Sequence, residues 1–218
     1  MSELVDDHDS KSCGRKAVWV RFPPWAQNIM PLNKNNLAYV IGLALGDGNL
    51  SNPNGRAVRL RITCDTRYKN LIKRACLAIK KLLPENKVSI IKRAKTFCDI
   101  SCYSNRWEDW LGWKAKQGSK YKQKVSIPTW IIENKTYSIH CLRGLLETDG
   151  SIYIDRGYKM VNFVTIIPTL ADDVMRIIKT IGFNAKIYKI KSLHKDRYNI
   201  RLSKDVDCFL KVVEFIKN

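Results

Sequence analysis

The sequence has no long hydrophobic run, few acidic residues relative to basic ones, and little histidine. No segment reaches the roughly 18 consecutive apolar residues that a membrane-spanning helix needs, and no signal-peptide pattern opens the chain. We therefore expect an intracellular protein of the cytoplasm or nucleoid, with an organelle as an alternative. The three histidines, His8, His140 and His194, are scattered, which disfavours a zinc site.

The seven cysteines include no Cys-x-x-Cys pair. Six of them occur in apolar stretches, which predicts reduced core thiols rather than metal ligands or disulfides. These six are Cys64, Cys76, Cys98, Cys102, Cys141 and Cys208.

The excess of basic over acidic residues is the main compositional signal. The 218 residues contain 39 Lys and Arg against 20 Asp and Glu, a net charge of +19. This charge exceeds what solubility requires and indicates a polyanionic partner, with nucleic acid first among the candidates. The hydrophobic fraction of 45% is ordinary for a globular protein with a packed core, so one or two folded domains are expected.

Two segments of the chain have nearly the same pattern. Residues 40–48 (VIGLALGDG) and 142–150 (LRGLLETDG) are each an apolar helical run that ends on an aspartate, Asp47 or Asp149. Gly42 and Gly144 stand inside these runs, where glycine costs about 1 kcal/mol relative to alanine, so close helix packing is the expected reason for them. Packing at these glycines would bring the two aspartates side by side, which predicts a divalent-metal site.

The same order of elements follows both segments. Residues 57–63 alternate, so Val58, Leu60 and Ile62 should face a core while the residues between them face outward. Thr66 is the expected cap of the first helix after them, and Gly182 closes its counterpart. The first half is predicted to contain strands 49–51 and 57–63, helix 66–83, strands 87–95 and 97–103, and a helix from 105. The second half is predicted to contain a short helix at 125–132, the motif helix from about 137, strands 151–155 and 158–166, helix 169–181, strands 185–191 and 198–203, and helix 204–217.

These residues resemble the LAGLIDADG homing endonuclease family in its single-chain, two-motif form. Residues 142–150 follow the nine-position family motif closely, and residues 127–131 (IPTWI) are also similar to that family. The first copy departs from the motif at Ala44 and Leu45 but keeps Asp47 and Gly48. The resemblance implies an α+β fold of two pseudo-symmetric αββαββα repeats, packed through the motif helices and forming a saddle of two antiparallel four-stranded sheets. Its expected parts are an N-terminal extension (1–30), a first repeat (31–111), a basic linker (112–124) and a second repeat (125–218).

The resemblance also implies an activity. The expected protein is a monomeric, site-specific endonuclease that hydrolyses both strands of a long asymmetric DNA target with Mg²⁺, or with Mn²⁺ or Ca²⁺ in the same sites. Asp47 and Asp149, with the carbonyl groups of Gly46 and Thr148, would bind the metal. Lys204 is the expected catalytic lysine, although it could be only a surface lysine at a helix N-terminus. Asn105 takes the matching place in the first half, where a helix cap is the simpler role for it. Because the two halves then carry different residues at this place, the two active sites would differ, and one DNA strand should be cut faster than the other.

On the same resemblance, outward side chains of the strands enter the major groove, where Arg, Asn, Ser and Thr pair with base edges. Lysines at strand ends and in the linker would contact phosphates, which gives salt-dependent affinity. The assigned DNA-binding residues are Asn49, Ser51, Arg56, Arg59, Arg61, Thr63, Ser151, Tyr153, Asn162, Lys186, Tyr188, Asn199, Arg201 and Ser203.

Other functions and roles stay open. An RNA-binding intron maturase and a non-catalytic DNA-binding regulator are the alternatives, and the presence of both Asp47 and Asp149 argues against the second. Glu147 is expected to make structural contacts rather than to bind metal, and the tryptophans of residues 107–113 are expected to pack in the core. Residues 1–30 share nothing with the repeat; they are either the product of an overlap with a tRNA gene or a basic arm that contacts DNA.

Overall fold

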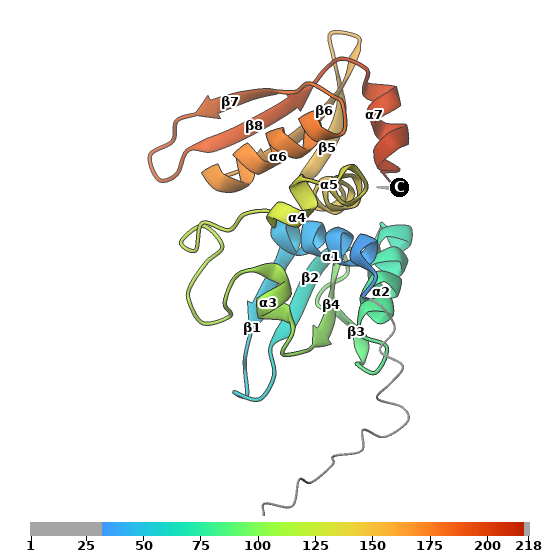
Figure 1. Cartoon of the computed structure of the whole chain (residues 1–218), viewed down its shortest axis with the longest axis vertical. Coiled ribbons are helices and arrows are strands. Elements are labelled where there is room, and N and C mark those ends of the chain that lie inside the picture. The colour runs from blue at the N-terminus through green and yellow to red at the C-terminus, as the bar shows by residue number, and fades with distance from the viewer. Residues whose placement is uncertain (1–31, 216–218) are drawn as a thin grey trace, which may run out of the picture. The chain divides into compact units, whose positions relative to one another are not determined.

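The computed structural model describes residues 32–215, which contain two copies of one element order (Figure 1). The predictions for residues 1–30 and for the end of the last helix lie outside this range. The first copy comprises α1 (Lys34–Asp47), β1 (Gly48–Ser51), β2 (Arg59–Asp65), α2 (Lys69–Leu82), β3 (Val88–Lys92), β4 (Phe97–Tyr103) and α3 (Trp107–Leu111). The second comprises α4 (Thr129–Ile132), α5 (Lys135–Asp149), β5 (Gly150–Asp155), β6 (Tyr158–Thr165), α6 (Pro168–Thr180), β7 (Lys186–Ile190), β8 (Arg197–Leu202) and α7 (Val206–Val213).

Each copy forms one four-stranded antiparallel sheet. The strand orders are β1-β2-β4-β3 and β5-β6-β8-β7, so the two sheets have the same topology. The predicted α+β fold with two pseudo-symmetric halves is therefore confirmed. Within residues 32–215, no helix has the length and apolar character needed to cross a membrane.

The motif helices α1 and α5 pack against each other at the two predicted glycines. A Cβ atom built on Gly42 would overlap the carbonyl oxygen of Cys141, and one built on Gly144 would lie 2.6 Å from the backbone nitrogen of Leu43. Backbone therefore meets backbone at the centre of the pair. Because α1 is covered on several sides, all its residues from Leu37 to Leu45 are buried.

The strands alternate as the sequence indicates. Leu60, Ile62 and Cys64 are buried on one face of β2, and Arg59, Arg61 and Thr63 are half-buried on the other. Helix α2 contributes its own buried face to the same core, with Leu71, Ala75, Ala78, Ile79 and Leu82. One face of each sheet is thus packed, which leaves the opposite face for a ligand.

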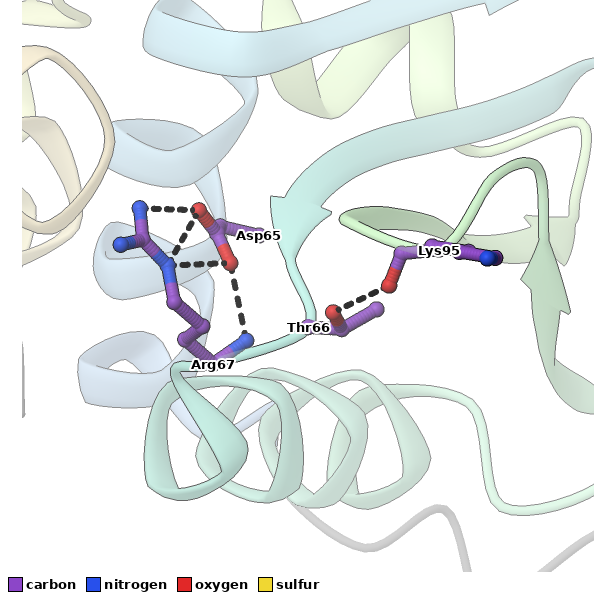
Figure 2. Close-up of polar contacts among 4 residues, drawn as sticks. All are labelled: Asp65, Thr66, Arg67 and Lys95. Carbon is purple, nitrogen blue, oxygen red and sulfur yellow. Dashed lines mark hydrogen bonds and ion pairs between the residues drawn. The ribbon is translucent and has the colours of Figure 1, made fainter.

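The start of α2 differs from the prediction. Thr66 does not cap the helix, which begins at Lys69. Figure 2 shows the Thr66 hydroxyl donating to the carbonyl oxygen of Lys95 at 3.1 Å, while the Asp65 carboxylate accepts from the backbone and side chain of Arg67. The backbone N–H of Thr66 also donates to the carbonyl oxygen of Thr96, at 2.9 Å. Thr66 therefore ties the β3–β4 turn to the end of β2.

Asn105 does not cap α3, because the residue at the N-cap is Arg106 and its N–H donates to the Ser104 hydroxyl. Cys208 is exposed rather than part of the core. The tryptophan prediction is confirmed: Trp107 and Trp113 are buried and Trp110 packs against the core.

Candidate active site and nucleic-acid interface

The acidic ends of α1 and α5 meet. Asp47 is the last residue of α1 and Asp149 the last of α5. A Cβ atom built on Gly46 would lie 3.2 Å from Oδ2 of Asp149, so this carboxylate reaches the end of α1. The side chain of Thr148 lies against Gly46 as well, and its hydroxyl donates back to the carbonyl oxygens of Gly144 and Leu145. The structure thus brings the predicted Asp47, Asp149, Gly46 and Thr148 to one place.

Lys120, which the sequence did not indicate as a functional residue, also lies at the end of α1. The Lys120 ammonium donates to the carbonyl oxygen of Leu45 at 2.7 Å, to that of Ala44 at 3.2 Å, and to that of Gly46. Burial lowers the pKa of Lys120, while the charges of Asp149 and Asp47 act to raise it. Nothing in the sequence separates Lys120 from the other linker lysines, because its place depends on the path of the linker.

A pocket of about 400 Å³ opens beside these groups. Asp149 and Lys120 line it together with two further cations, Lys195 just before β8 and Arg197 at the first position of that strand. The Lys195 ammonium lies 4.5 Å from the ring centre of Tyr121, which contributes to the same wall. The remaining lining residues are Leu45, Gly46, Ser119, Val164, Thr165, Ile166 and Ile167. One carboxylate with three cations can accommodate a phosphate group next to a metal ion.

The strand register places Lys204 away from this pocket. Gly150 pairs with Phe163, and Phe163 pairs with Ile200, so Asp149 is level with the middle of β8, and the pocket extends from there towards Arg197, the first residue of the strand. Lys204 lies four residues beyond Ile200, roughly 13 Å farther along at about 3.3 Å per residue. The geometry therefore does not support Lys204 as the catalytic lysine and favours Lys120, Lys195 and Arg197.

The ends of the motif helices suit a hard divalent cation. Two carboxylates and backbone carbonyl oxygens are the ligands that Mg²⁺ and Ca²⁺ prefer. The Gly46 carbonyl already accepts a hydrogen bond from the cationic Lys120, so it is accessible to a positive charge. Residues 32–215 contain no group of three or more His, Cys, Asp or Glu side chains that could hold a metal. An ion here would thus depend on the aspartate pair, on backbone carbonyls and on oxygens from a ligand.

Glu147, two residues before Asp149, has structural contacts. Its buried carboxylate accepts a hydrogen bond of 2.6 Å from the Tyr39 hydroxyl and pairs with Arg74 at 2.8 Å. Burial, and then the neighbouring Glu147 charge, raises the pKa of Tyr39 well above its usual value. Glu147 therefore links α5 to α1 and α2, as expected from the sequence.

The predicted DNA-binding residues of the first half share one sheet face. Asn49 pairs with Arg61, and Ser51 pairs with Arg59, whose Nε donates to the Ser51 hydroxyl at 3.2 Å. Thr63 follows on the same side of β2, and Arg56 is exposed in the preceding turn. The face is polar and cationic, as an interface with nucleic acid requires.

The second sheet presents an equivalent face. Ser151 pairs with Asn162, Asn162 with Arg201, and Arg201 with Lys186. The guanidinium carbon of Arg201 lies 5.6 Å from the ring centre of Tyr153 and 6.0 Å from that of Tyr188. Register also places Tyr188 opposite Asn199 on this face, and Ser203 is exposed just after β8.

Comparison with known proteins agrees with the two-copy architecture. The family model of a WhiA LAGLIDADG-like domain matches residues 36–98, and that of a LAGLIDADG-like domain matches residues 137–214. Comparison with curated protein sequences gives no significant match.

Solved structures share the fold. A structure of mesophilic variants of the homing endonuclease I-DmoI is 20% identical, with a TM-score of 0.60 over 83% of this chain and 95% of that one. I-DmoI in complex with DNA and Ca is 20% identical, with a TM-score of 0.60 over 83% and 89%. The N-terminal LAGLIDADG domain of DUF199/WhiA is 16% identical, with a TM-score of 0.56 over 84% of both chains. With one family match in each half and a motif helix at the centre of each, the chain belongs to the LAGLIDADG family in its single-chain, two-motif form.

Proposed function

We propose that this protein is a site-specific endonuclease that cuts double-stranded DNA with a divalent metal ion, for which Mg²⁺ is the first candidate. The observation that carries the proposal is the meeting of Asp47, Asp149 and Lys120 beside a cationic pocket. The similar I-DmoI has been solved in complex with DNA and Mn, and with its target DNA in the presence of Mg. Those complexes support DNA as the partner and a divalent ion as the cofactor.

Phosphodiester hydrolysis needs an activated water and stabilisation of the charge that develops on the phosphate. A bound divalent ion supplies both effects. In this chain Asp47, Asp149 and the carbonyl groups of Gly46 and Thr148 would hold it. The ammonium of Lys120 is buried next to the aspartates, and it would donate to a phosphate oxygen when one of its three bonds to the carbonyls of Ala44, Leu45 and Gly46 opens. Lys195 and Arg197 would hold the phosphate in the pocket.

We propose that the polar faces of the two sheets recognise the DNA sequence. They carry arginine, asparagine and serine side chains, which form hydrogen bonds with base edges in the major groove. The outlying lysines would add phosphate contacts, so affinity should fall steeply with salt. Because the two faces differ in sequence, the target should be asymmetric.

The two cutting centres are also unequal. Lys120, Lys195 and Arg197 all line the pocket with Asp149, whereas Asp47 is not among its lining residues. The two scissile phosphates would therefore lie in different surroundings. This supports the expectation that one strand is cut before the other.

Cleavage selection on randomised duplex DNA with Mg²⁺ tests the proposal. The parent should enrich one long asymmetric site, while Asp47→Asn and Asp149→Asn should bind that site and not cut it. Asp109→Asn is the matched control, because this aspartate is exposed on α3. Undiminished cutting by either active-site variant would overturn the mechanism. Sequence-specific binding without cutting by the parent would instead indicate a DNA-binding regulator.

A further inference from the structure

An acidic residue is buried on the face that we propose for DNA. Asp99 lies in the middle of β4 and is only 3% exposed, and register places it opposite Thr63, on the face that carries Arg61. Burial of a carboxylate is costly unless it is paired, and a negative charge here would repel phosphate. Its presence on this face needs a specific reason.

The contacts of Asp99 supply that reason. Its carboxylate accepts hydrogen bonds of 2.6 Å from Nε of Arg93 and 2.9 Å from the Thr63 hydroxyl, and Nε of Arg61 lies 3.9 Å away. Burial acts to raise the pKa of Asp99, but the hydrogen bonds and the two positive charges outweigh it and hold the pKa below its usual value. Asp99 is therefore ionised at neutral pH. It holds the Arg93 side chain by a hydrogen bond, and it attracts Arg61 by charge alone, because the Nε of Arg61 has no hydrogen-bond partner among the described residues.

The turn that carries Arg93 is held independently. The N–H groups of Arg93 and Ala94 both donate to the carbonyl oxygen of Phe97. Thr66 holds the same turn through Lys95 and Thr96, as Figure 2 shows for Lys95. Both the backbone and the side chain of Arg93 are thus fixed, and 42% of its side chain stays exposed.

The second sheet lacks this arrangement. The row Thr63, Asp99 and Ile91 of the first sheet corresponds to the row Val164, Asn199 and Tyr188 of the second. The counterpart of Asp99 is thus the neutral Asn199. The cluster around Asp99 therefore has no equivalent at this row of the second sheet, whose own acid–arginine pair, Asp155 with Arg201, lies in other rows.

We propose that Asp99 is a positioning residue that presets Arg61 and Arg93 to read base edges in the half of the target bound by the first sheet. The inference rests on the proposed function, because it assumes that this face binds DNA. A guanidinium that is already fixed loses less freedom on binding and can reject a wrong base more strongly. Asp99 would therefore set base preference without contacting a base itself.

Binding selection on randomised duplex DNA, scored at each base position in Ca²⁺, tests the inference separately from cleavage. Asp99→Asn keeps the shape of the side chain, removes its charge and introduces the residue type found at the matching place of the second sheet. We expect base preference to fall roughly fivefold or more at positions of the first half-site. Preference in the second half-site should not change. Asp155→Asn is the matched variant, because Asp155 pairs with Arg201 on the second sheet and should affect the second half-site alone.

The outcomes are distinguishable. A loss of base preference by Asp99→Asn that is confined to the first half-site supports the inference. An equal loss of preference in both half-sites, or an unchanged preference, overturns it. Arg93→Gln provides a second route if Asp99→Asn does not fold, and it should relax a subset of the same positions; unchanged preference in that variant also counts against the inference. A parent protein that selects no duplex contradicts the proposed function itself, and the inference fails with it.

Discussion

The ammonium group of Lys120 donates a hydrogen bond of 2.7 Å to the carbonyl oxygen of Leu45, in the last turn of α1. A cation at a helix C-terminus is favourable because the backbone carbonyls there carry partial negative charge. Lys120 belongs to neither motif helix and reaches the site from the segment between the repeats. The segment between the two repeats thus contributes Lys120 to the candidate active site.

Removal of the Lys120 ammonium should slow cleavage without weakening binding. For Lys120→Met we expect a loss of about 10²–10³ in single-turnover rate, the usual effect of losing one donor to developing charge. Affinity for the selected duplex should change little. Lys122→Met is the control, because Lys122 is exposed in the same segment. Equal losses in the two variants would contradict the assigned role.

The same lysine should compete with a divalent ion in the absence of DNA. Its ammonium already bonds to the Gly46 carbonyl, one of the proposed metal ligands. Lys120→Met should therefore bind Mn²⁺ several times more tightly than the parent, as measured by electron paramagnetic resonance of free Mn²⁺. An affinity equal to that of Lys122→Met, or a weaker one, would show that the Gly46 carbonyl is not a ligand.

Gly42 should be intolerant of even one methyl group. In Gly42→Ala the new Cβ would meet the Cys141 carbonyl, which is rigid backbone of the facing helix. We expect a loss of about 1–3 kcal/mol in the free energy of unfolding, measured with urea. Leu77→Ala on the exposed side of α2 should stay within about 0.5 kcal/mol of the parent. An equally small effect for Gly42→Ala would contradict the close packing of α1 and α5.

Glu147 should affect stability rather than metal binding. Glu147→Gln removes the charge that pairs with Arg74 and weakens the bond from Tyr39, so we expect a loss of about 1–3 kcal/mol in the free energy of unfolding. Glu133→Gln, at an exposed position, is the control. A change in Mn²⁺ affinity with unaltered stability would instead place Glu147 among the metal ligands.

The parts of the structure that the sequence predicted depend on local periodicity. The glycines of the motif helices and the alternation of Val58, Leu60 and Ile62 indicate their packing directly, because a face is defined by residue spacing alone. The hydroxyl and the backbone N–H of Thr66 donate to carbonyl oxygens of the β3–β4 turn, which is distant in the sequence, so the sequence indicates a helix cap instead. The distance of Lys204 from Asp149 depends on the register of β5, β6 and β8, which the sequence does not show. Lys120 depends on the tertiary path of a linker, which no local pattern encodes.

Cleavage of the selected duplex by Asp47→Asn and Asp149→Asn, in Mg²⁺ and at saturating protein, is the most direct test of the central claim. Both variants should bind the duplex as the parent does, and each should cut at least one strand more than a hundredfold more slowly. EDTA should abolish the cleavage by the parent while leaving binding in place. Cleavage of both strands at the parental rate by either variant would contradict the account.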